Sequence, residues 1–326
     1  MVGTPFKNPP SIETFAKHKI YITEKRLEAD VIVAHNYKKL LPFLVRNFKK
    51  RYLVWTNEPR YDISFTNEIK MPFRIPNINV MNVYGNEVFW HSLHFLGSYH
   101  FDESNNLGVD LNIKLENISK EKLRKSNRRH KVAALLTNNT IRKSTLIKDG
   151  MNIDLSQLRC AYSYSGHERN LLDIYGKGWP SGYALANSGY GYDYPRPWWE
   201  EKIRILKDYK FNLCLENTGH EFYITEKIWH AIYSGTLPIY HSLNSKIYDL
   251  FPKDSFLDVA HFPTADSLFT YIQNLRESEY LHRLNCCIDV FNECRKIKLE
   301  YNRLNTHEVE QKIICRLTRA ISANTN

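Results

Sequence analysis

The residues best suited to chemistry lie in one stretch, FNLCLENTGHEFYITEKIWHAIYSGTLPIYHS, at 211–242. A predicted strand ends there at Asn217, and Thr225 is placed to cap a helix that begins with Glu226 and Lys227. The start of a helix offers unpaired N–H groups and the positive end of a dipole, which together suit a pyrophosphate. Lys227 would add a full charge, and Glu226 could accept hydrogen bonds from ribose hydroxyls. The residues alone also allow a Glu226 that only complements the helix dipole and an ordinary surface Lys227.

The helix that positions these groups has an apolar stripe at helical spacing. Ile228, Trp229, Ile232 and Tyr233 form the stripe, and Gly235 ends the helix as a C-cap. Short apolar runs bounded by polar turns predict buried strands, which alternate with helical stretches and cover 30–34, 52–55, 132–138, 171–176, 211–217 and 236–240. This alternation predicts an α/β fold with parallel, doubly wound sheets, arranged as two Rossmann-like domains that face a cleft.

The length of 326 residues also suggests two domains. We expect an acceptor-side domain with its linker at 1–130, a nucleotide-binding domain at 131–305, and a C-terminal helix at 306–326 that packs back on the first domain. The composition, 43% hydrophobic and 25% charged, excludes a disordered or collagen-like chain.

The basic residues are concentrated between Lys120 and Lys131, where KEKLRKSNRRHK holds seven of them in a chain of net charge +10. Such a run is either a solvated linker or helix face, or a patch for nucleic acid or a membrane surface. It has no interleaved aromatic residues of the kind that stack on bases, which favours the first interpretation. The N-terminal residues lack the pattern of a signal peptide, so we expect a cytoplasmic protein with at most peripheral membrane contact.

The sequence predicts no metal site. It has no D-x-D motif, and His91, His94 and His100 cluster without the cysteines or carboxylates of a convincing zinc site. It also has no G-x-S-x-G motif and no P-loop, which gives no support to a serine hydrolase or a Walker NTPase.

The motif at 211–242 resembles the donor-binding motif of the α1,3/4-fucosyltransferases, glycosyltransferase family 10. That motif is a strand ending in E-N, then Y-[IV]-T-E-K, a helix and G-x-x-P-[IV], and this chain matches it at 216–217, 223–227 and 235–239. A weaker resemblance covers about 130–275. It implies a soluble, microbial-type member with the GT-B fold, which transfers fucose from GDP-β-L-fucose with inversion. The implied product is an α1,3- or α1,4-fucoside on an oligosaccharide or glycan acceptor that contains N-acetylglucosamine.

The resemblance also implies roles for individual residues. Arg159, 17 residues before Gly176, takes the place of an arginine that contacts the donor phosphates, although Arg169 could take this role instead. Glu58, which ends the run TyrLeuValTrpThrAsnGlu, takes the place of the catalytic base. The implied donor-binding set is Arg159, Asn217, Tyr223, Glu226 and Lys227. No cofactor is implied, and Mn²⁺ or Mg²⁺ would be at most stimulatory.

Two other functions remain open at this stage. One is a GT-B glycosyltransferase that uses a different nucleotide sugar. The other is a nucleic-acid-binding protein that uses the basic run at 120–131, although this leaves the Y-I-T-E-K stretch without a purpose.

Overall fold

The structure of this chain is a computed structural model. It describes residues 5–44, 46, 49–56, 58–59, 68–72, 75–82, 108–138, 145–186, 197–304 and 308–322. The histidines at 91, 94 and 100 lie outside the described residues, so the expectation about them stays a prediction.

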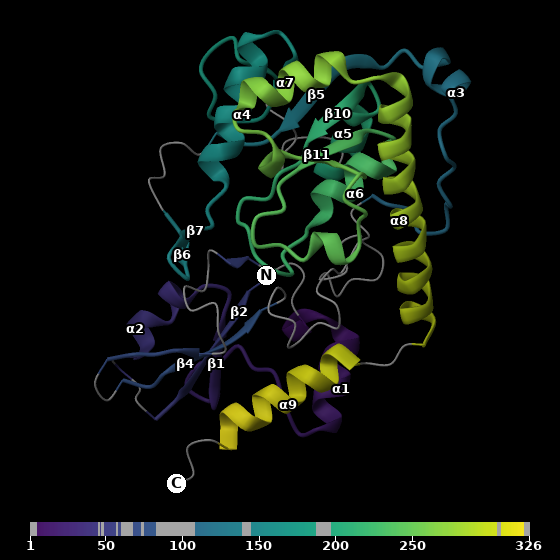
Figure 1. Cartoon of the computed structure of the whole chain (residues 1–326). Helices are drawn as coiled ribbons and strands as arrows, with labels where there is room; N and C mark the ends of the chain where they lie inside the picture. Colours follow the sequence, from purple (N-terminus) through teal and green to yellow (C-terminus); the bar gives the residue numbers. More distant parts are fainter. Residues whose placement is uncertain are drawn as a thin grey trace.

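The N-terminal unit contains a four-stranded sheet in the order β1-β2-β4-β3 (Figure 1). Its strands are β1 (Val31–Ala34), β2 (Arg51–Thr56), β3 (Glu68–Ile69) and β4 (Ile78–Asn82), of which β1, β2 and β4 are parallel and β3 is antiparallel to β4. Alternate residues of β2 enter two different apolar clusters, with Tyr52 and Val54 on one face and Leu53 and Trp55 on the other. Both faces of β2 are therefore covered, as in the central strand of a parallel sheet. The helices of this unit are α1 (Pro9–Lys17), α2 (Leu41–Leu44), and the 3₁₀ helices η1 (Pro5–Lys7) and η2 (Tyr37–Lys39).

The second unit contains a six-stranded sheet in which all the paired strands are parallel. Its order is β12-β11-β10-β5-β8-β9. The strands are β5 (Arg129–Leu135), β8 (Leu172–Tyr175), β9 (Ala184–Ala186), β10 (Tyr209–Leu213), β11 (Leu237–Tyr240) and β12 (Leu257–Asp258). The predicted α/β class, with a largely parallel sheet in each of two units, is confirmed.

Helices cover this larger sheet. They are α4 (Ser156–Glu168), α5 (Trp198–Leu206), α6 (Glu226–Tyr233), α7 (Ala265–Asn274) and α8 (Glu277–Leu304), with η4 (Ile247–Asp249), η5 (Val259–His261) and a small hairpin of β6 (Ile147–Lys148) and β7 (Met151–Asn152). The stripe predicted for α6 is found, since Ile228, Trp229 and Ile232 are fully buried. Gly235 follows this helix with a φ of +70°, the left-handed conformation of a C-cap glycine.

The segment at 108–128, which the sequence assigned to the first domain and its linker, packs on the second unit instead. Val109, Leu111 and Leu123 join the apolar core of that unit. Asn292 of α8 makes two hydrogen bonds with the backbone of Leu115. Its side-chain oxygen accepts the Leu115 N–H at 3.0 Å, and its amide nitrogen donates to the Leu115 carbonyl at 2.9 Å. A few apolar side chains and amide contacts are enough to dock a segment that looks polar in sequence.

The basic run lies in α3 (Lys120–Lys125) and at the start of β5, and the chain itself binds most of its charges. Ion pairs join Lys122, Arg124 and Lys125 to carboxylates, while Arg129 and Lys131 share Asp173. This pairing supports a structural interpretation of the run.

Helix α8 runs from the second unit towards the first, and α9 (Glu308–Ser322) then lies against α1 (Figure 1). Ser11 on α1 donates a 2.9 Å hydrogen bond to Glu310 on α9. Apolar residues from both units and from α9 meet in one cluster, here called the joint cluster, formed by Phe6, Phe15, Leu53, Trp55, Met81, Tyr223, Ile313, Ile314 and Leu317. Within the described part of the chain, none of the helices has the length and apolar character needed to span a membrane.

Candidate functional site

Glu58 follows β2 at the carboxyl edge of the N-terminal sheet. The side-chain hydroxyl of Thr56 accepts the Glu58 N–H and donates to the Glu58 carbonyl, each at 3.0 Å, and so holds the turn that presents the carboxylate. His35 follows the parallel strand β1 at the same edge, close enough for its charge to interact with that of Glu58. Burial lowers the pKa of His35 and outweighs the opposing effect of Glu58, so the imidazole is neutral at neutral pH. A carboxylate and a neutral imidazole therefore share this edge.

Asn217, from the second unit, contacts Glu58 at this edge. Strand β10 ends at Leu213, earlier than the sequence predicted, and 214–217 extend beyond the sheet as a loop. The amide Nδ2 of Asn217 donates a 3.1 Å hydrogen bond to Oε2 of Glu58. The structure thus brings together two predicted site residues that lie 159 positions apart and follow strands of different sheets.

Arg159 lies one turn into α4, the helix that follows a backbone contact with Asn217. The N–H of Leu155 donates to the carbonyl of Asn217 at 3.0 Å, which fixes the start of the helix, and the N–H of Arg159 donates to the carbonyl of Leu155 at 3.0 Å. The Arg159 side chain is largely buried, at 8% exposure for the residue, and its Nε has no acceptor among the described residues. A buried Nε–H without an acceptor is costly for a folded chain, and a phosphate could supply the missing partner.

Arg169, the other candidate for this role, is already bound elsewhere. It lies just after α4, where its Nη1 is 3.4 Å from the carboxylate of Asp266 and its Nη2 donates to the hydroxyl of Thr270 at 3.2 Å. These contacts fasten α4 to α7. The geometry therefore favours Arg159 over Arg169 as the predicted phosphate contact.

Lys227 sits in a network that the sequence did not predict. Its Nζ donates to Oε2 of Glu216 at 2.8 Å and to the hydroxyl of Thr225 at 2.7 Å, and its side chain is 18% exposed. The N–H and the hydroxyl of Thr225 both donate to Oε1 of Glu216, each at 2.8 Å. Thr225 is the N-cap residue of α6, but its hydroxyl makes no capping bond. The expectation of a threonine cap was wrong, because the buried carboxylate of Glu216 draws that hydroxyl and the first N–H to itself.

Glu226 and Lys202 complete this network, and both are almost fully buried. Burial alone would raise the pKa of Glu226, but the positive charges of Lys227, Lys202 and His230 hold it well below its ordinary value. Burial lowers the pKa of Lys202, while Glu226 opposes that shift. Two carboxylates and two ammonium groups thus balance one another beneath the start of α6.

Sequence reasoning missed Glu216 and Lys202. Glu216 was recognised as part of the E-N motif but was given no role, although a carboxylate directly after a buried strand is a signal in itself. Lys202 stands three and four positions before Ile205 and Leu206 on α5, which places it on the buried face of that helix. A lysine in such a stripe requires a buried anion, and Glu226 meets this requirement.

Tyr223 lies in the joint cluster rather than beside Arg159. The residue is 5% exposed and packs in the apolar cluster that contains Trp55 from β2 and Ile313 from α9. This position gives its ring a packing role between the two units.

Residues 170–326 match the sequence profile described as "Glycosyltransferase family 10 (fucosyltransferase) C-term". Over these residues, the chain is similar to glycosyltransferase family 10. Glu216, Asn217, Tyr223, Glu226 and Lys227 all lie within the matched residues, and Glu58 and Arg159 lie before them.

Named fucosyltransferases align with parts of the chain. It is 32% identical over 134 residues to alpha-(1,3)-fucosyltransferase 4 of Bos taurus, which covers 40% of this chain and 30% of that protein. It is 41% identical over 95 residues to the alpha-(1,3)-fucosyltransferase FucT of Helicobacter pylori, which covers 29% of this chain and 18% of that protein. The alignments thus span less than a third of the length of these relatives. A crystal structure of an alpha1,3-fucosyltransferase aligns at 19% identity and a TM-score of 0.47, over 84% of this chain and 75% of that chain.

Proposed function

We propose that this chain is an inverting fucosyltransferase. It would move L-fucose from GDP-β-L-fucose to a hydroxyl of a glycan that contains N-acetylglucosamine, with an α1,3 or α1,4 linkage in the product. The match of residues 170–326 to the family 10 fucosyltransferase model supports the reaction class. The observation that carries the mechanism is the 3.1 Å hydrogen bond between Asn217 and Glu58, because it puts a carboxylate from one sheet at the loop that precedes the Y-I-T-E-K motif on the other.

The reaction needs one base and a means of stabilising the leaving group. In a single step, the Glu58 carboxylate takes the proton of the acceptor hydroxyl as that oxygen bonds to the anomeric carbon of fucose. The bond from that carbon to the GDP oxygen breaks at the same time, and GDP leaves with the bonding electron pair. Attack from the face opposite GDP inverts the anomeric configuration. A positioned carboxylate base contributes roughly 10²–10⁴-fold to such a step.

Arg159 provides the charge that the departing diphosphate needs. It lies one turn into α4, whose first turn is bound to the Asn217 carbonyl, and a guanidinium can donate two parallel hydrogen bonds to phosphate oxygens. Lys227 is less available, since Glu216 already binds its ammonium group, but 18% of its side chain remains exposed at the start of α6. Both cations are in place before the reaction, so they can stabilise the developing negative charge without reorganisation.

The first experiment is a paired binding and transfer assay. Isothermal titration with GDP, UDP and ADP should show a preference for GDP, and transfer from GDP-fucose should occur to N-acetyllactosamine, lacto-N-biose or an N-glycan core. Glu58→Gln keeps the shape of the side chain but removes its basicity, so we expect kcat to fall about 10²–10⁴-fold with little change in GDP affinity. Glu68→Gln, an exposed glutamate on β3 of the same sheet, is the matched control and should keep the wild-type kcat.

Each outcome of this experiment has a clear meaning. A preference for UDP or ADP would favour a GT-B transferase with another nucleotide sugar. A normal kcat in Glu58→Gln would remove this carboxylate from the mechanism.

We also propose that turnover requires no divalent metal, because Arg159 and Lys227 can take over the work of an ion on the diphosphate. Activity in excess EDTA should therefore persist, with Mn²⁺ or Mg²⁺ at most stimulating it. Complete loss of activity that one added metal restores would contradict this.

A further inference from the structure

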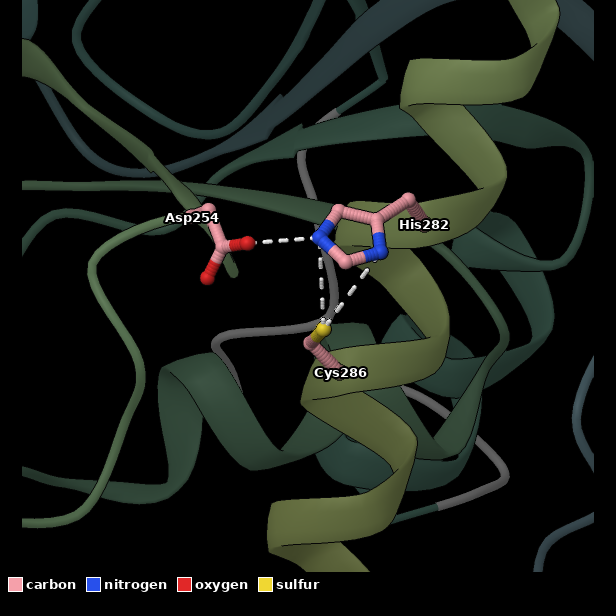
Figure 2. A group of neighbouring side chains, drawn as sticks. All are labelled: Asp254, His282 and Cys286. Atoms are coloured by element: carbon pink, nitrogen blue, oxygen red, sulfur yellow. Dashed lines mark hydrogen bonds and ion pairs between the residues drawn. The ribbon is translucent and has the colours of Figure 1, made fainter.

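Three potential metal ligands meet on the surface of the second unit, on elements that the proposed donor site does not use. His282 and Cys286 lie four positions apart on α8, and Asp254 belongs to the turn at 252–255 that precedes β12 (Figure 2). Their ligand atoms all lie within 4.8 Å of one another. Residues four apart share one face of a helix, so α8 itself aligns the imidazole with the thiol.

The turn that carries Asp254 is held in place from both sides. Phe251 and Phe256, which flank it, are buried in the core at 1% and 2% exposure. Within the turn, the N–H and the hydroxyl of Ser255 both donate to the carbonyl of Pro252, at 3.1 and 2.6 Å. The Asp254 carboxylate is therefore presented to α8 by a fixed backbone, and its side chain is 57% exposed.

His282 lies within reach of both other groups. Its Nε2 is 2.5 Å from Oδ2 of Asp254, and Sγ of Cys286 lies 3.8 Å from Nε2 and 4.0 Å from Nδ1 (Figure 2). The thiol is thus almost equidistant from the two ring nitrogens, and Nε2 is the nitrogen that lies near both the carboxylate and the thiol.

The distances also suit a tetrahedral ion. With metal bonds of about 2.0 Å to nitrogen and oxygen and about 2.3 Å to sulfur, neighbouring ligand atoms lie roughly 3.3–3.5 Å apart. The His282–Cys286 separation is within a few tenths of an ångström of this. The Asp254–His282 hydrogen bond must open by roughly 1 Å, which rotation of an exposed aspartate can supply.

We propose that Asp254, His282 and Cys286 form a binding site for a divalent transition-metal ion of the zinc class. A set of one imidazole, one thiolate and one carboxylate suits Zn²⁺ or Co²⁺ and not Mg²⁺ or Ca²⁺, which prefer oxygen ligands. Water fills the fourth position. Asp289 lies three positions after Cys286 on α8 and adds negative charge near the thiol, which favours a cation there. The ion would fasten the first turns of α8 to the turn at 252–255.

Cobalt titration tests this site without reference to activity. Adding Co²⁺ to the full, untagged, EDTA-treated chain should give a thiolate-to-cobalt charge-transfer band that saturates at one equivalent. Competition with Zn²⁺ should abolish the band, and Mg²⁺ should not. Cys286→Ser should remove the band, while His282→Gln and Asp254→Asn should weaken Co²⁺ affinity roughly tenfold or more.

Cys315→Ser is the matched control, because Cys315 is an exposed thiol on α9, and this variant should keep the band. Zn²⁺ should also raise the melting temperature of the wild type but not of Cys286→Ser. Circular dichroism checks that each variant is folded. The proposal fails if the wild type gives no charge-transfer band, if the band survives in Cys286→Ser, or if it disappears only in Cys315→Ser.

Discussion

Arg159 and Lys227 are both predicted to contact the donor diphosphate, but their surroundings differ. Lys227 is bound to Glu216 and helps to balance Glu226, so its removal would leave buried carboxylates without a counter-charge. A Lys227→Ala variant would therefore lose stability as well as donor binding, and the two effects would be mixed. Arg159 neutralises no carboxylate among the described residues, which makes it the better probe of the phosphate site.

We expect Arg159→Ala to raise the KM for GDP-fucose and to lower kcat, because a contact to the leaving diphosphate strengthens as charge develops. The combined loss in kcat/KM should be roughly 10²–10³-fold. Arg169→Ala is the matched control, because that guanidinium is bound to Asp266 and Thr270, and it should stay within about threefold of the wild type. Steady-state kinetics on both variants checks this, and equal losses in the two would show that the site is misplaced.

At the scale of elements, local patterns predicted much of the fold. The stripe and the C-cap glycine of α6 follow from helical spacing, and β1, β2, β5, β8 and β11 all fall within or beside apolar runs that were predicted as strands. The prediction failed where a contact with a residue distant in sequence determines the local structure. Thr225 gives up its capping role to Glu216, and the segment at 108–128 docks on α8, because side chains far away in sequence offer better partners than the local backbone does.

In the candidate site too, local sequence patterns predicted the individual residues but not the contacts between distant segments. The motif identified Asn217 and Lys227 as site residues, and the strand before Glu58 predicted the edge on which it lies. The contact between Glu58 and Asn217 depends on how the two sheets are placed, which no local pattern encodes. Tyr223 belongs to the same motif, yet its ring packs in the joint cluster because apolar side chains from the other unit surround it.

Gly176, directly after β8, tests how tightly the strand ends of the second sheet are packed. Its φ is +151°, and a Cβ there would lie 2.1 Å from the carbonyl oxygen of Leu136, after β5. Gly182 has a φ of +86° but open space around an added Cβ, so it is the matched control. Backbone strain should cost roughly 1–2 kcal/mol in either alanine variant, and the clash should bring Gly176→Ala to about 3 kcal/mol or more. Urea unfolding measures both, and equal losses would mean that β5 and β8 yield easily at this point.

At the scale of the whole molecule, the joint cluster connects three parts of the chain that are far apart in sequence. Trp55 comes from the strand that leads to Glu58, Tyr223 from the loop that leads to α6, and Ile313 from α9. Packing among them fixes how the N-terminal sheet sits against the second unit. The cluster should therefore control whether Glu58 reaches its position beside Asn217, although none of the three side chains needs to touch a substrate.

The last prediction separates this packing role of Tyr223 from a direct role in donor binding. Tyr223→Ala and Ile313→Ala each remove a buried side chain from the joint cluster, so each should lower the free energy of unfolding by roughly 2–5 kcal/mol. Both should also lower kcat, because the alignment of Glu58 loosens, while GDP affinity stays within about twofold since Arg159 and Lys227 are untouched. Urea unfolding, kcat and GDP titration on the two variants provide the comparison. If Tyr223→Ala alone weakens GDP binding tenfold or more, its ring contacts the nucleotide and the packing interpretation is wrong.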